Sequence, residues 1–511
     1  MTERKQFRAI KGTRDILPPD STLWNWFEQT ARDTFERYGY RDIRTPIFEE
    51  TELFARSIGT ETDVVAKEMY TFPDRPFGEV EQVKDVDSFD KYFREVNRAY
   101  ESGEIPRSEG NRVAIANLQM ISQAAADLFP PTTGMNAEQR DELLENILGV
   151  LASSAALQLG PSLTLRPEAT ASVVRAYIEH GMQTLPGDVK LYYMGPMFRR
   201  ERPQKGRYRQ FYQIGAEVLG QSDAPAIDAE LIETLLVFFR RAGLDRTTLY
   251  INSIGDKNCR PQYVELLREE LRKVKDSLGA DSQRRIETNP LRVLDSKLPE
   301  EQAIIEKLPR ISDHLCAECR EHFAKLKEEL KLRGVVYEEN WRLVRGLDYY
   351  TRTTFEVTAA GLGSQNAVCG GGRYDGLVEL LGGPPTKGIG FAIGSDRAIL
   401  SIQEGGKLPH LPGLAVFIAW MGAKCYPAAV AIARKLRESG VSVELPPEEM
   451  KFKKSLGLAD KLGARYALII GEDEVTSETY SLKRLSDGEQ KKLNENDLLE
   501  YLESERRGTG A

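Results

Sequence analysis

Positive charge is concentrated in one short stretch of a chain that is acidic as a whole. Six of the twelve residues from Phe198 to Arg209 are lysine or arginine, whereas the 511 residues together carry a net charge of −8. An arginine side chain donates two parallel, charge-assisted hydrogen bonds, which suits it to phosphate groups. The stretch therefore predicts a site for a phosphorylated ligand, with a solvated basic turn as the alternative.

The residues after this basic stretch alternate as they would in a β-strand. Gln213 and Glu217 then share one face, and Gly215 between them has no side chain and leaves space. A buried glutamine and glutamate beside such a space could recognise the polar edges of a small ligand. An ordinary exposed polar face is an equally good interpretation of this pattern alone.

Other polar residues occur where a strand runs into a turn. Glu168 follows "LTLRP", and Arg345, Tyr349 and Tyr350 lie in "LVRGLDYY". The glycines of "GLGSQN" do not indicate a dinucleotide site, because Asn366 replaces the third glycine and no helix is expected there. The glycines of "CGGGRYDGL" and "GIGFAIG" instead predict places where the backbone is approached closely.

One segment has the composition of a metal site, "HLCAECREH", with His314, Cys316, Cys319 and His322. These residues spread around more than one face of the expected helix, and no second pair of ligands follows them. We therefore expect no metal site. Five cysteines in so long a chain also argue against a disulfide framework and favour the reducing cytoplasm. From the residues given, we expect neither a secretory signal nor a membrane-spanning segment.

The basic stretch requires a long antiparallel hairpin to position it. "VKLYYMGPMF" and "QFYQIGAEVLG" are the expected strands, around a polar loop with Pro203 and Gly206. Upstream, apolar spacing predicts a helix from Trp24 to Tyr38 that ends at Gly39. Pro46 should interrupt the strand that follows.

The chain changes character twice more. Residues 75–161 contain 8 basic and 14 acidic residues, a net charge of −6, and predict an acidic helical insertion. The stretch from about residue 228 to 332 is expected to be rich in helix. After a linker near residues 407–412, strands alternate with helices, which predicts a small α/β domain with a largely parallel sheet.

Six stretches, in family order, resemble the histidyl-tRNA synthetases, which are class II aminoacyl-tRNA synthetases. They are "KGTRDILP", "YRDIRTPIFEETELFARSIG", "FRRERPQKGRYRQFYQIGAEVLG", "LVRGLDYY", "GGGRYDGL" and "GIGFAIGSDRAIL". The second, with Pro46, resembles the dimer-forming motif 1, and the third and last resemble motifs 2 and 3. The likeness covers nearly everything except residues 75–161.

The resemblance implies an α+β fold, in which an antiparallel sheet flanked by helices forms the catalytic core. That core would comprise residues 1–74, 162–256 and 336–405, with a helix-rich insertion domain in 257–335. Residues 411–511 would form an α/β anticodon-binding domain. Residues 75–161 have no counterpart in the family pattern, and their role stays open. The family forms homodimers, so we expect a homodimer here.

The family uses ATP to activate histidine as histidyl-adenylate and then transfers it to tRNA(His). The resemblance therefore implies L-histidine, ATP, Mg²⁺ and tRNA(His) as ligands, and Arg199 and Arg345 as catalytic residues. The implied histidine site is Glu168, Ala169, Thr170, Arg199, Gln213, Glu217, Arg345, Tyr349 and Tyr350. The implied ATP site is Arg199, Glu201, Arg207 and Arg397. The implied tRNA contacts are Arg202, Gln204 and Lys205, at the hairpin tip.

Two positions depart from the family pattern. Ala169 stands where glycine is usual, and Asp396 stands where glutamate commonly precedes the motif 3 arginine. These changes bear on the local turn and on ATP binding.

Two other functions compete with the synthetase. The regulatory subunit of ATP phosphoribosyltransferase shares the core fold and binds histidine as a sensor, but it typically lacks the C-terminal domain and loses the arginines. A pure tRNA-binding factor would make no adenylate. Here the arginines are present, and Lys451, Lys453, Lys454, Lys461 and Arg465 form a candidate tRNA-facing stripe in the C-terminal domain.

Overall fold

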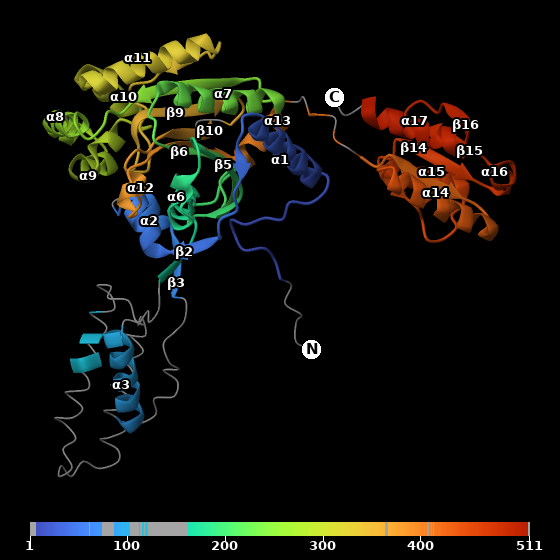
Figure 1. Cartoon of the computed structure of the whole chain (residues 1–511), viewed down its shortest axis with the longest axis horizontal. Coiled ribbons are helices and arrows are strands. Elements are labelled where there is room, and N and C mark those ends of the chain that lie inside the picture. The colour runs from blue at the N-terminus through green and yellow to red at the C-terminus, as the bar shows by residue number, and fades with distance from the viewer. Residues whose placement is uncertain are drawn as a thin grey trace. The chain divides into compact units, whose positions relative to one another are not determined.

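The computed structural model divides into two compact units, Met1–Leu17 with Phe27–Lys407 and Pro18–Trp26 with Leu408–Ala511. The residues that it describes are 7–60, 62–73, 86–102, 112, 115–116, 118–120, 162–362, 366–405, 408–409, 411 and 413–508. Figure 1 shows the elements of both units coloured along the chain.

The first unit contains an eight-stranded sheet in the order β1-β5-β6-β11-β10-β9-β7-β8. Its strands are β1 (Arg41–Asp42), β5 (Val189–Phe198), β6 (Gln210–Gly220), β7 (Thr247–Ser253), β8 (Glu338–Glu339), β9 (Thr351–Ala359), β10 (Ala367–Arg373) and β11 (Lys387–Gly394). The two edge strands pair in parallel and all the central pairs are antiparallel. The expected antiparallel core is thus confirmed.

Helices cover both faces of this sheet. On one face lie α1 (Asp20–Arg37) and α7 (Pro225–Arg241), where Phe35 packs between Phe238 of α7 and Tyr192 and Phe391 of the sheet. On the other face lie α6 (Thr170–Glu179) and α12 (Leu377–Leu380), which share a buried core with β5. The expected first helix is confirmed, and Gly39 after it has a φ of 82°.

The long hairpin is the central feature of the sheet. Strands β5 and β6 pair from Val189↔Leu219 to Phe198↔Gln210 without a break in register. The expected hairpin is therefore confirmed. The space predicted beside Gly215 is filled, however, since a Cβ there would lie 2.3 Å from the Tyr193 ring.

A smaller sheet lies at the start of the unit, in the order β2-β4-β3. Its strands are β2 (Phe48–Glu50), β3 (Tyr70–Pro73) and β4 (Ser162–Leu165). Between β2 and β3 come α2 (Thr51–Ile58) and a π-helical turn, Val64–Glu68. Pro46 falls between β1 and β2, so the expected interruption of the strand is confirmed.

The stretch expected to be helical contains one strand that the sequence pattern did not reveal, β7. Its helices are α7, α8 (Arg260–Lys273), α9 (Ala280–Thr288), α10 (Pro299–Ile305) and α11 (Ala317–Leu332). Figure 1 shows α7 and α11 lying side by side. α13 (Ser395–Glu404) packs against β6 and ends the unit.

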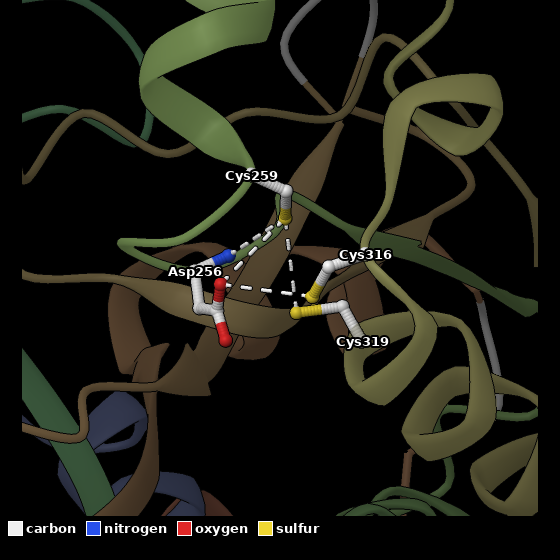
Figure 2. A group of neighbouring side chains, drawn as sticks. All are labelled: Asp256, Cys259, Cys316 and Cys319. Carbon is white, nitrogen blue, oxygen red and sulfur yellow. Dashed lines mark hydrogen bonds between the residues drawn. The ribbon is translucent and has the colours of Figure 1, made fainter.

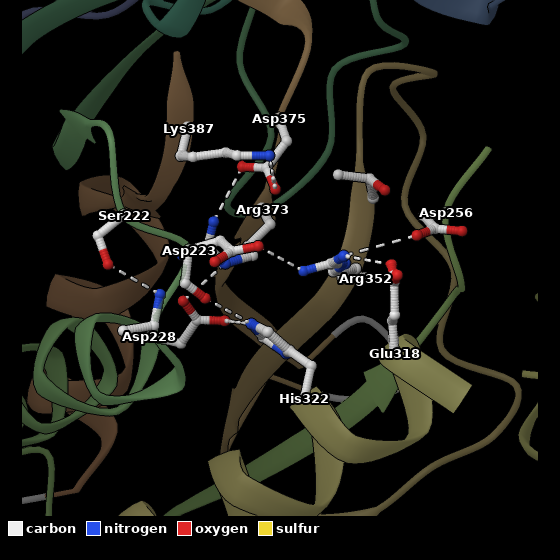
Figure 3. Close-up of polar contacts among 12 residues, drawn as sticks. Ser222, Asp223, Asp228, Asp256, Glu318, His322, Arg352, Arg373, Asp375 and Lys387 are labelled. Atoms are coloured by element: carbon white, nitrogen blue, oxygen red, sulfur yellow. Dashed lines mark hydrogen bonds and ion pairs between the residues drawn. The ribbon is translucent and has the colours of Figure 1, made fainter. Parts of the chain in front are cut away.

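Buried charges fasten α7 and α11 to the sheet (Figure 3). Arg373, at the end of β10, donates from Nε to Asp228 Oδ1 at 2.8 Å, and both side chains are almost completely buried. His322 of α11 lies 3.8 Å from the other oxygen of Asp228, and burial lowers its pKa. A neutral His322 therefore completes a packing network, away from the cavity described below.

The second unit has a five-stranded sheet in the order β13-β12-β14-β15-β16. Its elements are β12 (Val416–Trp420), α14 (Tyr426–Glu438), β13 (Val443–Glu444), α15 (Phe452–Lys461), β14 (Tyr466–Ile470), α16 (Glu472–Ser477), β15 (Thr479–Arg484), β16 (Gln490–Asn494) and α17 (Glu495–Gly508). The expected parallel pairing holds for the first three strands and is wrong for β15 and β16. A parallel crossover needs a dozen or more residues, and the 6-residue helix α16 is too short for one.

The predicted insertion is described only in part. α3 (Val86–Ser102) is helical, as expected. Within the predicted insertion, the run of residues 135–158, whose composition most favours a helix, lies outside the described residues. Within the described parts of the chain, no helix has the length and apolar character needed to cross a membrane.

Candidate functional site

A cavity of about 310 Å³ collects most of the residues singled out in the sequence. Strands β6, β9, β10 and β11 contribute to its walls, together with the start of α6 and the loop before β9. The predicted residues that line it are Glu168, Thr170, Arg199, Glu201, Arg207, Gln213, Arg345, Tyr349, Tyr350 and Arg397. Ala169, Glu217, Arg202, Gln204 and Lys205 are outside this lining.

Two arginines and a glutamate form one end of the cavity. Arg199 follows directly after β5, and its backbone N–H donates to the Arg209 carbonyl at 2.9 Å, which extends the hairpin by one bond. Its Nε donates to the Pro167 carbonyl at 2.9 Å. Glu201 lies between Arg199 and Arg207, with N–O distances of 3.8 and 3.4 Å. These long ion pairs leave both guanidinium groups available to an anion.

Arg345 reaches the same cavity from the loop before β9. Its Nη1 donates to Glu356 Oε2 of β9 at 2.9 Å, and its Nε is buried without a partner in the described parts of the chain. The guanidinium lies against Gly370 of β10, where a Cβ would be 1.9 Å from Nη2. Because Gly370 has no side chain, the Arg345 guanidinium can lie against the backbone of β10. This is the close approach to the backbone that the glycines of "CGGGRYDGL" predicted.

Arg397 enters from the first turn of α13. Its Nη1 donates to the Ala367 carbonyl at 2.7 Å, and its pKa is lowered by burial and by Arg207 nearby. The preceding Asp396 accepts from Arg14 Nη2 at 2.7 Å and from the backbone N–H of Tyr212 at 2.8 Å. Asp396 therefore fastens α13 to β6, so that Arg397 faces the cavity.

Another part of the cavity wall is built on the start of α6. Glu168 accepts the backbone N–H groups of Thr170 at 2.7 Å and Ala171 at 2.9 Å, so its carboxylate caps the helix. Burial raises the pKa of Glu168. Gln213 of β6 lines the same side, and its Oε1 is buried with no hydrogen-bond partner among the described residues. A buried acceptor left open in a cavity indicates a ligand that donates a hydrogen bond.

Glu217 lies beneath this side and is fully buried. Its Oε1 accepts from the Thr170 hydroxyl and its Oε2 from the Tyr374 hydroxyl, each at 2.7 Å. A Cβ at Gly390 of β11 would lie 1.7 Å from Oε2, so that glycine provides the room for the carboxyl group. Burial raises the pKa of Glu217 to about 8. The carboxyl group thus orients two hydroxyls that belong to cavity-lining residues.

Tyr349 and Tyr350 complete the enclosed end of the cavity. Their ring centroids are 4.7 Å apart, and the Tyr349 ring meets that of Tyr374 at 5.9 Å. Burial raises the pKa of Tyr350 to about 12. These aromatic rings and hydroxyls can enclose a small planar, polar group.

Comparisons with known proteins agree with this geometry. A family model described as histidyl-tRNA synthetase matches residues 156–398, and one described as anticodon binding domain matches residues 415–505. The histidine–tRNA ligase of Koribacter versatilis (strain Ellin345) is 46% identical over 499 residues, 97% of this chain and 96% of the relative. The chain belongs to the histidyl-tRNA synthetase family.

Two further members of the synthetase family also match nearly the whole chain. The histidine–tRNA ligase of Solibacter usitatus (strain Ellin6076) is 46% identical over 498 residues, 97% of this chain and 99% of the relative. The solved apo histidyl-tRNA synthetase of S. aureus is 32% identical, with a TM-score of 0.68, and the likeness covers 98% of this chain and 100% of that one.

The departures from the histidyl-tRNA synthetase pattern have a structural explanation. Ala169 is the residue before α6, with φ −113° and ψ −17°, values that any L-residue adopts. It is fully buried and its carbonyl accepts the N–H of Val173. Alanine therefore keeps the turn intact. Asp396 reaches its two partners in spite of its shorter side chain.

The tip of the motif 2 hairpin lies outside the cavity. Arg202, Gln204 and Lys205 are exposed, and Gln204 and Arg207 close the turn with backbone hydrogen bonds of 3.1 and 2.8 Å. Lys205 Nζ pairs with Glu404 Oε1 of α13 at 2.6 Å. The structure thus separates the predicted tRNA contacts from the cavity residues.

Three residues with a place in or beside the site were not singled out in the sequence. They are Tyr374, Glu356 and Arg14. Tyr374 lies within "GGGRYDGL", so the resemblance carried the signal for it. Arg14 likewise lies within "KGTRDILP", whereas Glu356 lies in a strand that carries no motif, and no local pattern reveals it.

The four residues of "HLCAECREH" do not come together. His314 packs on the Tyr263 ring at 5.8 Å, and His322 belongs to the network of Figure 3. Cys316 and Cys319 instead face Asp256 and Cys259, which precede them in the sequence. The second ligand pair, Asp256 and Cys259 in "DKNC", precedes the segment instead of following it.

Proposed function

We propose that this chain attaches L-histidine to tRNA(His), using ATP and passing through a histidyl-adenylate. The observation that carries the proposal is one cavity lined both by the arginines Arg199 and Arg345 and by an open buried acceptor, Gln213 Oε1. Such a site can hold a phosphate and an amino group at once.

Adenylate formation follows from the charges at the arginine end. In-line attack of the histidine carboxylate on the α-phosphate brings two anions together, and fixed cations stabilise that transition state. We assign Arg199 to the α-phosphate and Arg345 to the bridge between this phosphate and the carboxylate. Since the carboxylate is itself the nucleophile, no side chain of the enzyme has to attack.

The remainder of ATP is assigned to residues around the same end. Arg397 and Arg207 supply positive charge. Glu201 pairs with Arg207 while no ATP is bound. Mg²⁺ accompanies ATP, and the carboxylates of Glu201 and Glu356 line the cavity with the oxygen ligands that this ion prefers.

The α-amino group of histidine is assigned to Glu168, Thr170 and Gln213. The carboxylate of Glu168 offers negative charge, and Gln213 Oε1 offers an acceptor that has no other partner among the described residues. Ala169 contributes to the site by holding the turn between Glu168 and Thr170. Together these groups orient the amino acid with its carboxylate toward the arginines.

The imidazole is assigned to the enclosed end, where Tyr349 and Tyr350 surround it. Glu217 recognises the ring through the Thr170 and Tyr374 hydroxyls that it orients. A side chain without polar ring nitrogens would leave these buried groups unpaired, which is costly and gives selectivity.

Two surfaces are proposed to meet tRNA(His). Arg202, Gln204 and Lys205 at the exposed hairpin tip are placed to contact the acceptor end, whose single-stranded phosphates are accessible. In the anticodon-binding domain, Lys453 and Lys454 are exposed on α15 and offer charge for the anticodon stem.

A homodimer is proposed from an apolar surface of the small sheet. Ile47, Phe48 and Phe72 are 45%, 48% and 38% exposed, and they lie in or next to β2 and β3, the two strands that flank β4. Three large apolar side chains in one place favour a partner surface, and the resemblance to motif 1 assigns a second copy to it. Light scattering of the purified chain tests the dimer. We also propose a cytoplasmic location, as for the synthetases that the chain resembles.

The histidine-sensing regulatory subunit is disfavoured by the retained machinery. Arg199, Arg345 and Arg397 all reach the cavity, and the anticodon-binding domain is present. A sensor needs neither. The ligases named above also match nearly the whole chain.

Histidine-dependent exchange of pyrophosphate into ATP tests the proposed function. We expect exchange with histidine and none with other amino acids, followed by charging of tRNA(His). Folded protein that binds histidine without exchange would identify a sensor. Normal tRNA affinity without exchange would identify a tRNA-binding factor.

A further inference from the structure

A cluster of three thiols and one carboxylate lies outside the cavity (Figure 2). It consists of Asp256, Cys259, Cys316 and Cys319, whose ligand atoms all lie within 4.8 Å of one another. Asp256, Cys259 and Cys319 are buried and Cys316 is half-buried. Two stretches that are far apart in the sequence, residues 256–259 and 316–319, thus bring three sulfur donors and one oxygen donor together.

The spacing of these donor atoms matches a tetrahedron around a small cation. Bonds of about 2.3 Å from zinc to sulfur place two ligand sulfurs about 3.8 Å apart. The Sγ atoms of Cys259 and Cys319 are 3.9 Å apart, and Asp256 Oδ1 lies 3.6 Å from Cys259 Sγ and 3.9 Å from Cys316 Sγ. A disulfide would need sulfurs about 2.05 Å apart.

The backbone around the cluster is shaped to bring the donors close. Cys316 is the residue before α11 and Cys319 lies in its first turn, while Cys259 precedes α8. Gly255 has a φ of 66°, and a Cβ there would lie 2.8 Å from Cys259 Sγ. The backbone N–H of Asn258 holds Asp256 Oδ1 at 2.9 Å and fixes the carboxylate. No larger residue fits at Gly255 without moving a thiol.

The charges around the cluster suit a divalent cation. Three thiolates and one carboxylate carry four negative charges, of which a divalent ion neutralises two. Arg352 Nη2 lies 3.6 Å from Asp256 Oδ2 (Figure 3), whereas the thiols lie against Oδ1 (Figure 2). An outer partner of this kind orients a metal-ligating carboxylate. Arg260, next to Cys259, adds further positive charge.

We propose that Asp256, Cys259, Cys316 and Cys319 bind one Zn²⁺ as a closed, four-ligand structural site. Thiolate-rich tetrahedral sites select zinc among the common divalent cations, and a site with four protein ligands has no position left for catalysis. The ion would join the ends of α8 and α11, which are far apart in the sequence.

The zinc site would also stabilise the loop before β9, which lines the cavity. Arg260 Nη1 donates to the carbonyl of Tyr350 at 2.5 Å, and the N–H of Arg352 donates to the Gly255 carbonyl at 2.8 Å. The Zn²⁺ would therefore hold the loop that carries Tyr349 and Tyr350 through backbone contacts. This role does not depend on the proposed function of the cavity.

Metal analysis of the purified full-length chain tests the proposal. Elemental analysis should find about one zinc per chain in the native protein. Cys316→Ser and Cys319→Ser should lose most of it. Cys425→Ser is the matched control, because Cys425 is buried like Cys319 but lies in the other unit, and the zinc content of this variant should be unchanged.

A second measurement needs no variant and covers the case in which a substitution prevents folding. Modification of the thiols of the native chain with a mercurial should release one equivalent of zinc, read with a metal-sensitive dye. A strong chelator should lower the unfolding temperature by about 5 °C, and added zinc should restore it.

Three results would overturn the proposal. The first is a native chain that carries no zinc and whose unfolding temperature zinc does not change. The second is a disulfide, seen as three titratable thiols instead of five under denaturing, non-reducing conditions. The third is stoichiometric iron with the visible absorbance of an iron–thiolate centre.

Discussion

The two ends of the proposed active-site cavity differ in how firmly their charged groups are held. At the enclosed end, Glu217 is fully buried and both of its oxygens accept short hydrogen bonds of 2.7 Å. At the arginine end, the side chains of Arg199 and Arg207 are 21% and 41% exposed, and their distances to Glu201 are 3.8 and 3.4 Å. At the enclosed end, the carboxyl group of Glu217 has hydrogen-bond partners before any ligand binds. At the arginine end, the guanidinium groups remain available to bind an anion.

This contrast separates selection from catalysis. Selectivity needs polar groups that cannot move to suit a wrong side chain, and burial with full hydrogen bonding provides that rigidity. Stabilisation of a phosphate needs cations whose existing partners are weak enough to be exchanged. We expect substitutions at the enclosed end to change histidine binding, and substitutions at the arginine end to change the rate of adenylate formation.

The largest effect should come from Arg199→Ala. Loss of one fixed cation at the reacting phosphate should lower kcat for histidine-dependent pyrophosphate exchange about 1000-fold, or about 4 kcal/mol. The KM for histidine should change less, since the other residues assigned to the amino acid remain. Arg200→Ala is the matched control, because Arg200 stacks on Tyr70 and is not part of the cavity lining. An equal loss in both variants would contradict the assignment.

Glu217→Gln should act at the other end of the cavity. Above pH 8, where Glu217 is ionised, both of its oxygens accept from a hydroxyl, whereas an amide donates toward one of the two hydroxyls, so the pair of oriented hydroxyls is lost. We expect the KM for histidine to rise about 100-fold, or about 2.7 kcal/mol, with a smaller change in kcat. Steady-state exchange kinetics at varied histidine measure both.

Two further variants sharpen this result. If Glu217 recognises the imidazole through a hydroxyl, Tyr374→Phe should raise the KM for histidine to a similar extent. Glu179→Gln provides the control, since Glu179 is an exposed glutamate at the end of α6. A normal KM in Tyr374→Phe together with a raised KM in Glu217→Gln would instead indicate direct contact with the ring.

The pH dependence of stability should also report on Glu217. Burial raises its pKa from 4.5 to about 8, so between these values the folded chain holds a proton that the unfolded chain releases. Stability is therefore lost as the pH rises through this window, by at most about 1.4 kcal/mol per pH unit for this one proton. Denaturant unfolding at pH 6, 7 and 8 should show a shallower decline for Glu217→Gln. Identical slopes would contradict a buried, protonated carboxyl group.

Much of the cavity could be predicted from the sequence because its residues sit in short, ordered motifs. The hairpin, the alternation that puts Gln213 and Glu217 on one side, and the glycines of β10 are local features that survive folding. The space at Gly215 was predicted wrongly, because the Tyr193 ring that fills it comes from the neighbouring strand. The cluster of Asp256 with Cys316 joins residues 60 positions apart, and its register depends on the packing of helices.

Gly370→Ala tests the support of Arg345 rather than the arginine itself. The added methyl group would lie 1.9 Å from Nη2, so the guanidinium must move away from its present place. We expect kcat for exchange to fall about 10-fold, or about 1.4 kcal/mol, with the fold intact by circular dichroism. Gly457→Ala, on α15 where a Cβ meets nothing within 4 Å, should leave exchange unchanged. Unaltered exchange in Gly370→Ala would show that Arg345 does not act from this place.

Arg202→Ala should have the smallest effect and the most selective one. Arg202 is exposed at the hairpin tip and outside the cavity, so pyrophosphate exchange should stay at the native rate. The KM for tRNA in aminoacylation should rise a few-fold. The slope of the logarithm of tRNA affinity against the logarithm of salt concentration should become shallower by about 0.7, the value for one contact to a single-stranded phosphate. Lys205→Ala should do less, because Glu404 already engages Lys205. A fall in exchange with an unchanged KM for tRNA would mean that the tip belongs to the ATP site, and the division of the hairpin between two ligands would be wrong.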